Sequence, residues 1–379
     1  MVNIMGIKIG IVGVGSFAQC FIPLFKAHPL VSEVTLCDLD ADKLEKNCVF
    51  HGISKKSPSL EHLLETDVDA VAIITQNWLH GPQSLQAINA GKHVYSAVPA
   101  GISVSEIRDL VKAVENTGKI YMMGETSYYY PAVILCREKY QKGEFGNIVY
   151  GEAEYYHDFD HGLYDVFKLR GGERWMEIAG SPPMHYPTHS TSQIISVTGA
   201  HMTHVSCVGF ADKTDDKVFR EDTNIWQNIF SNESALFKMS DGSCCRINEF
   251  RRIGHIGAVR MTLFGTEGSF EQNTSGTAWL TKHGLENVDD LLNLTESGYA
   301  KIHQTERLPK EFKDLQDNGH GGSHQFLVDD FVKACVYGKT PPINVWEAAR
   351  YTIPGIIAHE SAVRGGILLG IPDFGDPKF

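Results

Sequence analysis

A glycine-rich turn between two apolar runs restricts the fold of this chain more than any other feature of its sequence. The run Lys8–Val12 leads into Gly13-Val14-Gly15-Ser16-Phe17-Ala18, and after a periodic stretch a second apolar run, Val34–Cys37, ends in Asp38. In a strand–turn–helix unit, Gly13 permits the tight turn, Gly15 lets a pyrophosphate approach bare backbone, and Ala18 lets the helix pack close to the strand. The pattern predicts a dinucleotide-binding unit.

Asp38 indicates which dinucleotide this unit binds. A carboxylate at the end of the second strand can accept hydrogen bonds from both ribose hydroxyls, and it repels a 2′-phosphate. We therefore expect NAD rather than NADP as the cofactor. The residues predicted to hold it in this unit are Gly13, Gly15, Ser16, Phe17, Ala18 and Asp38.

Length and charge limit the other classes open to the chain. Its 379 residues are too many for one core, so about two domains are expected. A formal net charge of −12 argues against a nucleic-acid or anionic-membrane partner. The eight cysteines form no C-x-x-C pair, which favours reduced core thiols. The N-terminus lacks the features of a signal peptide, and no apolar run approaches the ~18 residues of a membrane span, so we expect a cytoplasmic protein.

The first third of the chain alternates strands and helices. Predicted strands lie at 69–74, 92–95 and 120–123, and predicted helices at 60–65, 82–90 and from Ser103 to Gly118. Ser103 and Glu106 form a capping-box pattern at the start of the last helix. Such alternation predicts a parallel sheet with helices on both faces, and thus a Rossmann domain over residues 1–125.

The pattern changes beyond Glu125. After a predicted helix at 131–143 come strand-like runs at 148–157, 204–210, 225–231, 235–239, 244–250 and 259–264, with a hairpin signal at Asp241-Gly242. Residues 273–320 are polar and are expected to be irregular, and helices are expected again at 326–336 and 346–364. We predict an α/β chain whose C-terminal α+β domain, residues 126–379, is built on a largely antiparallel, open-faced sheet that can cover a cofactor.

The order of these parts resembles the Gfo/Idh/MocA superfamily of NAD(P)-dependent sugar oxidoreductases over essentially the whole chain. The resemblance rests on Asn77-Trp78-Leu79-His80, Gly91-Lys92-His93-Val94 and Gly265-Thr266-Glu267-Gly268. It implies cofactor contacts at Asn77, His80 and Pro99. Where that family has Glu-Lys-Pro this chain has Ala97-Val98-Pro99, and its later Asp-x-x-x-His pair corresponds to His185 and His189.

A narrower branch, the NAD-dependent α-N-acetylgalactosaminidases and related NAD-dependent glycosidases, is more similar. It shares valine before the proline, as well as Gly124-Glu125, Tyr155-Tyr156-His157-Asp158, Arg174-Trp175, Tyr186-Pro187-Thr188-His189, Gly319-His320-Gly321-Gly322 and Ile371-Pro372-Asp373-Phe374. The resemblance implies a glycosidase in which the sugar is oxidised at C3 by NAD, loses its C2 proton, eliminates the aglycone from C1, adds water and is reduced again. It also implies that Arg174, Trp175 and Glu125 contact the cofactor.

Several polar residues are candidates for the acid–base steps. His189 can take the C3 hydroxyl proton as a neutral imidazole, the alternative being a structural histidine. Tyr186 can act as a base or orient the sugar, and His185, four residues before His189, can share its face as a hydrogen-bond donor. The remaining candidates are Tyr155, His157 and Glu125.

The reasons for these remaining candidates differ. Tyr155 and His157 alternate onto one face of a strand, above the small residues Gly151 and Ala153, which would leave room for a ligand. They suit a base and its hydrogen-bond partner, although a packed aromatic residue is nearly as good an interpretation. Glu125 ends a predicted parallel strand, where ligand sites gather.

Other functions and partners remain open at this point. Histidine pairs at 157/161, 185/189 and 320/324 lack the cysteine or glutamate of a zinc motif, so no metal is predicted. The alternatives to a glycosidase are an NAD-dependent sugar or glycoside dehydrogenase (a 3-oxidase) that releases NADH, and a dinucleotide sensor without turnover. The substrate expected is a small sugar or glycoside. The resemblance implies a homo-oligomer built through the C-terminal sheet.

Overall fold

The computed structural model describes residues 6–289, 305–315 and 320–377. The chain divides into two compact units: unit 1 comprises Met1–Tyr130, Thr295–Ala349 and Phe374–Phe379, and unit 2 comprises Pro131–Leu294 and Arg350–Asp373. The first break lies close to the predicted boundary at residue 125. Residues 295–349, by contrast, group with the N-terminal unit and not with the C-terminal domain in which the sequence placed them.

Unit 1 contains a six-stranded sheet in the order β3-β2-β1-β4-β5-β6, and every neighbouring pair is parallel. This order is that of a Rossmann fold, with the switch point between β1 and β4. The prediction of an N-terminal Rossmann domain is confirmed. The strands are β1 (Ile7–Val12), β2 (Val31–Cys37), β3 (Lys55–Ser57), β4 (Ala70–Ile73), β5 (His93–Ser96) and β6 (Tyr121–Met123).

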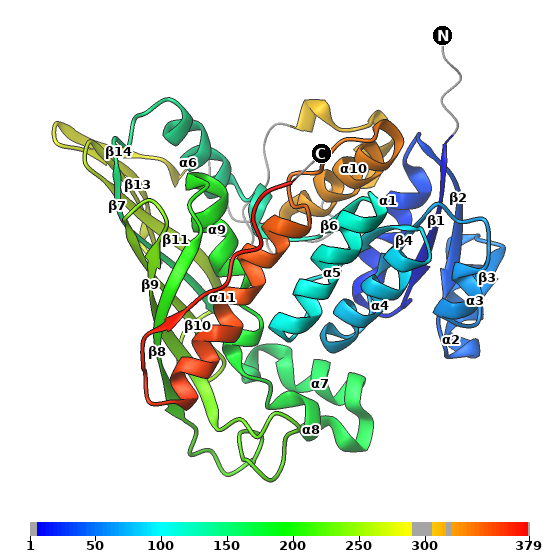
Figure 1. Cartoon of the computed structure of the whole chain (residues 1–379), viewed down its shortest axis with the longest axis horizontal. Helices are drawn as coiled ribbons and strands as arrows, with labels where there is room; N and C mark the ends of the chain where they lie inside the picture. The colour runs from blue at the N-terminus through cyan, green and yellow to red at the C-terminus, as the bar shows by residue number, and fades with distance from the viewer. Residues whose placement is uncertain (1–5, 290–304, 316–319, 378–379) are drawn as a thin grey trace. The chain divides into compact units, whose positions relative to one another are not determined.

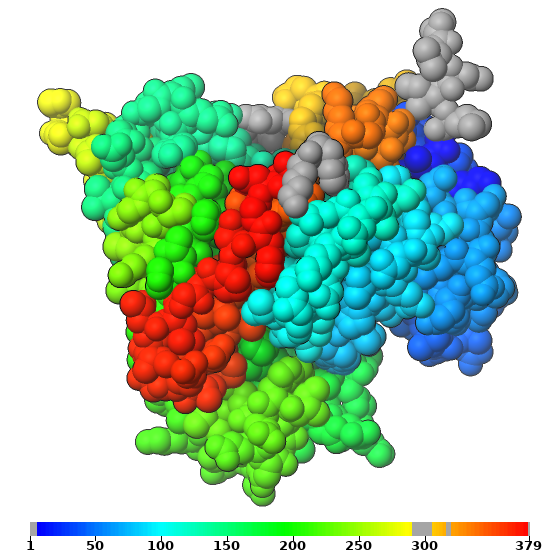
Figure 2. Space-filling view, viewed as in Figure 1, coloured from blue at the N-terminus to red at the C-terminus, as the bar shows by residue number. Residues whose placement is uncertain are grey.

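The helices of unit 1 lie alongside this sheet (Figure 1). In α5 (Val104–Thr117), the buried Ile107 and Leu110 lie opposite exposed polar residues that form part of the cyan surface in Figure 2. The predicted cap is present, since Ser103 accepts the Glu106 N–H at 3.2 Å, but Glu106 reaches the N–H of Ile102 instead of Ser103. The other helices are α1 (Ile22–Ala27), α2 (Ala41–His51), α3 (Leu60–Leu64), α4 (Asn77–Asn89) and α10 (Ser323–Tyr337).

Helix α4 begins earlier than predicted. Proline usually marks the first turn of a helix, which is why the sequence suggested a start at Pro82. The chain instead turns helical at Asn77, after an extended Gln76 whose carbonyl accepts the Leu79 N–H at 2.8 Å, and Pro82 lies inside the helix. Asn77 and His80 therefore lie on the first turn of a helix at the carboxyl end of β4.

Unit 2 is built on a nine-stranded sheet in the order β14-β13-β12-β11-β7-β10-β9-β8-β15. Only β7 and β10 pair in parallel; the other described pairs are antiparallel, which confirms a largely antiparallel sheet. The strands are β7 (Ile148–Tyr156), β8 (Met202–Ala211), β9 (Phe230–Met239), β10 (Cys244–Phe250), β11 (Ala258–Gly265), β12 (Gly268–Asn273), β13 (Gly276–Thr281), β14 (Gly284–Asn287) and β15 (Leu369–Gly370).

Helix α9 (Thr188–Thr198) covers one face of this sheet across β7 and β11 (Figure 1). A side chain at Gly151 would come within 3.1 Å of Ile194 on α9 and of Leu263 on β11. The small residues of β7 therefore accommodate this helix, and the expectation that they leave room for a ligand is wrong. The other helices that begin in unit 2 are α6 (Pro131–Gln141), α7 (Tyr164–Gly171) and α8 (Trp175–Ala179), while α11 (Val345–Val363) begins in unit 1 and ends in unit 2.

Two segments of unit 2 differ from the prediction. Residues 225–229 are not a strand, because Asn224 and Asn228 hold them as a loop: Asn224 donates to the carbonyls of Val218 and Asn228 and accepts the Asn228 N–H. Such side-chain bonds compete with a sheet ladder. Strands β13 and β14 occupy residues expected to be irregular, because short turns at 274–275 and 282–283 join β12, β13 and β14.

Candidate active site

The glycine-rich turn of unit 1 has the conformation that a dinucleotide needs. Gly13 has φ +88°, and a Cβ there would lie 2.5 Å from the carbonyl oxygen of Ile74, so only glycine fits. Gly15 is the opposite case: the nearest atom to a Cβ would be Lys43 Nζ at 4.0 Å, which leaves the backbone open on that side. Gln19 ties the turn to α2, since its amide donates to the carbonyls of Val14 and Gly15 and to Asn47.

Asp38 lies directly beside this turn. Its Oδ2 accepts the N–H of Val14 and the Nζ of Lys43, each at 2.9 Å, and Oδ1 accepts the N–H of Asp40 at 3.1 Å. Burial would raise the pKa of Asp38, but these hydrogen bonds outweigh it and lower the pKa, so the carboxylate is charged at neutral pH. An open backbone at Gly15 and a charged carboxylate beside it fit the pyrophosphate and ribose of NAD.

The remaining residues of the turn support it from within unit 1. Ala18 is fully buried, which allows the 3₁₀ turn Phe17–Cys20 to pack onto the sheet. The ring of Phe17 contacts Phe21, and it also lies 6.1 Å from His320 and 5.6 Å from His324, measured between centroids. These two histidines lie on the segment that opens α10, so the later part of the chain contributes to this side of unit 1.

The other predicted contacts in unit 1 follow β4, β5 and β6. His80 is buried between two of these loops, with its Nδ1 2.9 Å from the carbonyl oxygen of Pro99 and its Nε2 3.2 Å from that of Thr75. Glu125 is fully buried, and its Oε1 accepts the N–H of Ser127 at 2.8 Å. Parallel strands bring their carboxyl ends to one edge of the sheet, which is the ligand edge of such folds.

In unit 2, four of the predicted catalytic side chains form a ring cluster, made of Tyr155, His157, Tyr186 and His189. Tyr155 Oη lies 2.7 Å from His157 Nδ1, and the Tyr155 ring lies 5.1 Å from His189 and 6.2 Å from Tyr186. Tyr186 and His189 are 5.3 Å apart. The end of β7 and the residue after it supply Tyr155 and His157, and the segment from the 3₁₀ turn before α9 into its first turn supplies Tyr186 and His189.

Burial sets the charge of His157, the histidine that contacts Tyr155. It lowers the pKa of His157 to about 4, and the positive charge of Arg251 lowers it further, so His157 is neutral at pH 7. A neutral His157 can accept the Tyr155 hydroxyl proton at Nδ1. The 2.7 Å contact aligns the phenol oxygen with an unprotonated ring nitrogen, whose lowered pKa makes it a weaker base than an ordinary histidine.

His185 does not join the ring cluster. It ends the 3₁₀ turn Pro183–His185, and α9 begins only after Pro187, so the helical spacing that would align it with His189 does not apply. Its ring packs against His359 at 5.0 Å, and burial lowers its pKa to about 3. The expectation that it shares the face of His189 is wrong.

Two buried glutamates that sequence reasoning missed lie behind these rings. Glu249 accepts from Ser190 Oγ at 2.6 Å and from Arg251 at 3.2 Å. Glu233 accepts the N–H of Met184 at 2.8 Å, and its other oxygen lies 2.7 Å from His359 Nδ1. Each lies two residues after or before an apolar residue that is buried on the same strand face, Ile247 before Glu249 and Ala235 after Glu233, which is the sequence signal that could have found them.

Arg174 and Trp175, predicted to contact the cofactor, are placed in unit 2. Arg174 is exposed and makes two hydrogen bonds with Glu177, at 2.6 and 2.7 Å. Trp175 packs against the small cluster that contains Phe159 and Tyr164. Their role toward the cofactor stays a prediction.

Two searches of the described residues complete this account. Within residues 6–289, 305–315 and 320–377, no group of three or more histidine, cysteine, aspartate or glutamate side chains is arranged to hold a metal ion. In the same ranges, no helix is long and apolar enough to cross a membrane.

Residues 7–125 match the Gfo/Idh/MocA oxidoreductase family with its NAD-binding Rossmann fold. The resemblance drawn from the sequence is confirmed by this match, and the cofactor is NAD. The parallel sheet, the open turn at Gly15 and the charged Asp38 agree with it. Fold and match together indicate an NAD-dependent enzyme whose N-terminal domain is similar to the Gfo/Idh/MocA oxidoreductases.

Two of the individual proteins to which this chain is similar over its length each have the name “glycosyl hydrolase family 109 protein”. That of Saccharopolyspora erythraea is 23% identical, with 97% of this chain and 83% of that protein covered. That of Shewanella amazonensis is 28% identical, with 97% and 85% covered. Among solved structures, a levoglucosan dehydrogenase in complex with NADH has the same fold, with a TM-score of 0.77, 16% identity, and 98% of this chain and 100% of that chain covered.

Proposed function

We propose that this chain is an NAD-dependent glycosidase that acts through transient oxidation of its sugar substrate at C3. The proposal is supported by the similarity to glycosyl hydrolase family 109 proteins and by the acid–base groups of unit 2. The observation that carries it is the Tyr155–His157 pair, because a phenol 2.7 Å from a neutral imidazole suits removal of a carbon-bound proton. Val98, where dehydrogenases of this type have lysine, agrees with it.

Each residue of the ring cluster has a step in this proposal. NAD supplies oxidation of C3 and later its re-reduction, which makes the C2 proton acidic in between. His189 takes the C3 hydroxyl proton, and Tyr186 orients the sugar. Tyr155 gives its hydroxyl proton to His157 Nδ1, and the tyrosinate oxygen then takes the C2 proton. The C1–O bond breaks with its electron pair leaving on the aglycone oxygen, which takes the proton from His157. Water adds at C1 and gives its proton to His157, Tyr155 returns a proton to C2, and the proton on His157 restores the Tyr155 hydroxyl.

The roles of the remaining predicted residues are part of the same proposal. The cofactor contacts are Gly13, Gly15, Ser16, Phe17, Ala18, Asp38, Asn77, His80, Pro99, Glu125, Arg174 and Trp175. His185 acts from behind the cluster, through its contact with His359. Residues 1–125 carry the cofactor, and the C-terminal sheet domain carries the sugar.

Isotope exchange at C2 tests the proposal. A panel of 4-nitrophenyl α- and β-glycosides is incubated with the protein in deuterated water, and the products are examined by NMR. We expect deuterium at C2, retained hydrogen at C3, released phenol and no net NADH. The control is Tyr155→Phe, which should bind NAD normally and lose the exchange. Efficient cleavage with hydrogen retained at C2 would contradict the mechanism.

The second candidate is a sugar or glycoside dehydrogenase that releases NADH. This candidate is retained because the chain has the same fold as a levoglucosan dehydrogenase. The same assay separates the two, since a dehydrogenase forms stoichiometric NADH from an intact glycoside.

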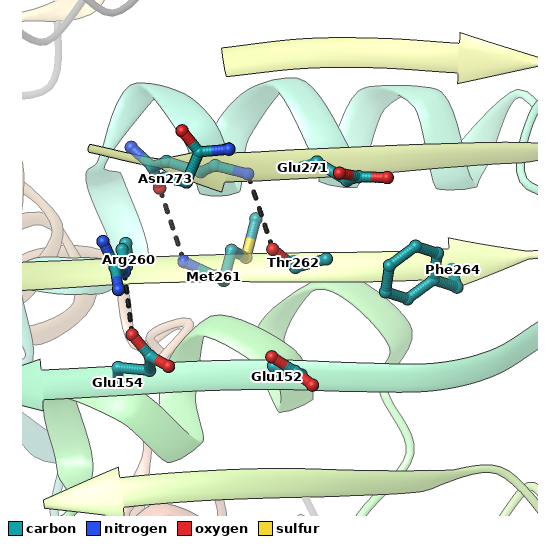
Figure 3. A pocket seen from close by; sticks show the side chains of 9 residues that line it. Glu152, Glu154, Arg260, Met261, Thr262, Phe264, Glu271 and Asn273 are labelled. Atoms are coloured by element: carbon teal, nitrogen blue, oxygen red, sulfur yellow. Dashed lines mark hydrogen bonds and ion pairs between the residues drawn. The ribbon is translucent and has the colours of Figure 1, made fainter. Parts of the chain in front are cut away.

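We also propose that the chain forms a homo-oligomer through the open face of its large sheet. This face carries the exposed apolar side chains of Val208, Phe210 and Leu236. It also carries an ion-pair network, in which Glu154 lies 2.8 Å from Arg260 and 3.4 Å from Arg246. A cavity of about 260 Å³ lies beside these charges (Figure 3). It is on the sheet face opposite the ring cluster, so it suits a protein contact better than the substrate. Light scattering at micromolar concentration tests this, and a monomer would reject it.

A cytoplasmic location is the last part of the proposal. All eight cysteines are thiols, and five of them are buried, which suits a reducing compartment. Fractionation of the cells that produce the protein checks this.

A further inference from the structure

A buried ion pair stands directly behind the ring cluster and has no role in the proposed chemistry so far. The guanidinium carbon of Arg251 lies 4.8 Å from the centroid of the Tyr155 ring. Arg251 Nη2 donates to Glu249 Oε2 at 3.2 Å, and the two side chains are only 10% and 0% exposed. Ser190, next to His189, donates to the other oxygen of Glu249 at 2.6 Å.

The backbone fixes Arg251 in this place. Strands β7 and β10 pair in parallel with Glu249 opposite Tyr155, so Arg251, two residues further on, points to the same sheet face as Tyr155 and His157. The Arg251 N–H donates to the carbonyl of Ser231 and to Asn232 Oδ1, each at 3.0 Å. Its carbonyl accepts the N–H of Phe159 at 3.1 Å. These bonds fix the backbone, and the guanidinium is held by Glu249 and by the carbonyl of Phe250, to which Nη1 donates at 3.2 Å.

We propose that Arg251 is a positioning residue, which fixes the Tyr155–His157 pair and supplies the positive charge against which a negative charge forms on Tyr155. The step in which the negative charge on Tyr155 is used, removal of the C2 proton, rests on the proposed function. A cation held over an aromatic ring is attracted to it, and the attraction grows when the ring carries an anion. Glu249 and Ser190 act through Arg251, since they hold its guanidinium in place.

The charged and titratable groups around the pair agree with this role. From β10 and the residue after it these are Glu249 and Arg251. From α9 and the turn before it they are His189 and Tyr186, and from the segment after β7, His161. Burial raises the pKa of Glu249 to about 7, although Arg251 opposes the shift. Near neutral pH, Glu249 therefore offsets the charge of Arg251 only in part.

Arg251→Met tests the proposal with the full-length protein and NAD, because methionine keeps much of the side-chain length but has no charge. With the aryl glycoside that is cleaved best, we expect C2 exchange to slow about 10- to 100-fold, with the pH optimum moved to higher pH. NAD affinity and the rate of C3 oxidation should change little. Arg251→Lys should recover part of the rate. The matched control is Lys139→Met, which removes another cation, 4.3 Å from the Trp279 ring in the same unit.

A second variant and a measurement without substrate complete the test. Glu249→Gln leaves the charge of Arg251 unopposed, so its optimum should move in the opposite direction, to lower pH. NMR titration of His157 should give a higher pKa in Arg251→Met than in the unchanged protein. Unchanged titration of His157 together with an unchanged pH profile would overturn the proposal. Equal loss of exchange and of C3 oxidation would also overturn it, because a purely structural role predicts that result.

These readouts separate the two proposals from each other. If the unchanged protein cleaves no glycoside with exchange at C2, the proposed function fails, whereas the titration of His157 still decides whether Arg251 controls the pair. If exchange is present and Arg251→Met leaves it and the pH profile unaltered, only the role of Arg251 fails.

Discussion

The glycine-rich turn of unit 1 and the ring cluster of unit 2 are built in opposite ways. The turn is mostly backbone and comes from one stretch of chain that ends at Asp38. The ring cluster is made of side chains from two separate segments, with a third, which carries Glu249 and Arg251, behind them. A site made from backbone depends on local conformation, whereas a site made from side chains depends on how distant segments pair. Substitutions should therefore affect cofactor binding in the first region and proton transfer in the second.

The largest effect is expected at His189. General acid–base groups contribute typically about 10²–10⁴-fold, so His189→Ala should reduce turnover by that order while NAD affinity stays nearly unchanged. Steady-state rates and a cofactor titration measure the two quantities. His283→Ala, at an exposed hairpin, is the control and should be active. Near-normal turnover of His189→Ala would make this histidine structural and would remove the contrast between the regions.

A smaller effect, on cofactor binding and not on proton transfer, is expected at Asp38. Asp38→Ala should weaken NAD binding by about 1.5–3 kcal/mol for each charge-assisted hydrogen bond lost, and should improve binding of NADP. Calorimetry measures both, and Asp42→Ala, exposed on the first turn of α2, serves as the control. If affinity for both cofactors is unaltered, the ribose does not lie at Asp38.

The two glycines of the turn sharpen the comparison inside unit 1. Gly13→Ala places a side chain at φ +88° and against the Ile74 carbonyl, which should cost about 1–2 kcal/mol or more of unfolding free energy. Gly15→Ala has space, so its stability should hold, but its methyl group should obstruct the pyrophosphate and weaken NAD binding. Denaturant unfolding and cofactor titration would show this crossed pattern. Equal behaviour of the two variants would contradict it.

The smallest effect concerns pH and unit 2. His185 has a pKa of about 3 in the folded chain, below the ordinary value of 6.5, so the unfolded chain binds its proton first and stability falls as the pH drops below about 6.5. His185→Phe should remove this contribution, which we expect to be about 1–2 kcal/mol at pH 5. Melting temperatures between pH 7 and pH 5 measure it, with His283→Phe as the control. The same slope in both variants would show that His185 is not kept neutral by burial.

The same contrast explains what could be predicted from the sequence. Gly13, Gly15 and Asp38 lie in one stretch, so their spacing alone predicts where they meet. Tyr155 with His157, and Tyr186 with His189, are local pairs and were also accessible. Glu249 and Arg251 were not, because only the pairing of β10 with β7 brings them behind Tyr155. The prediction at Pro82 was wrong because this proline lies inside its helix and does not begin it. The prediction at Asn224–Asn228 was wrong because side-chain hydrogen bonds hold a loop there in place of a strand.

The parallel pairing of β7 with β10 has a consequence for how such a chain can diversify. Because both strands run the same way, they end at the same edge, and the segments after Tyr155 and Glu249 emerge side by side. The loops between Asp158 and Ser243 can lengthen, shorten or be exchanged without separating those two ends, as long as Tyr186, α9, β8 and β9 keep their places. Substrate range can thus change by insertion while the proton-handling edge is inherited intact.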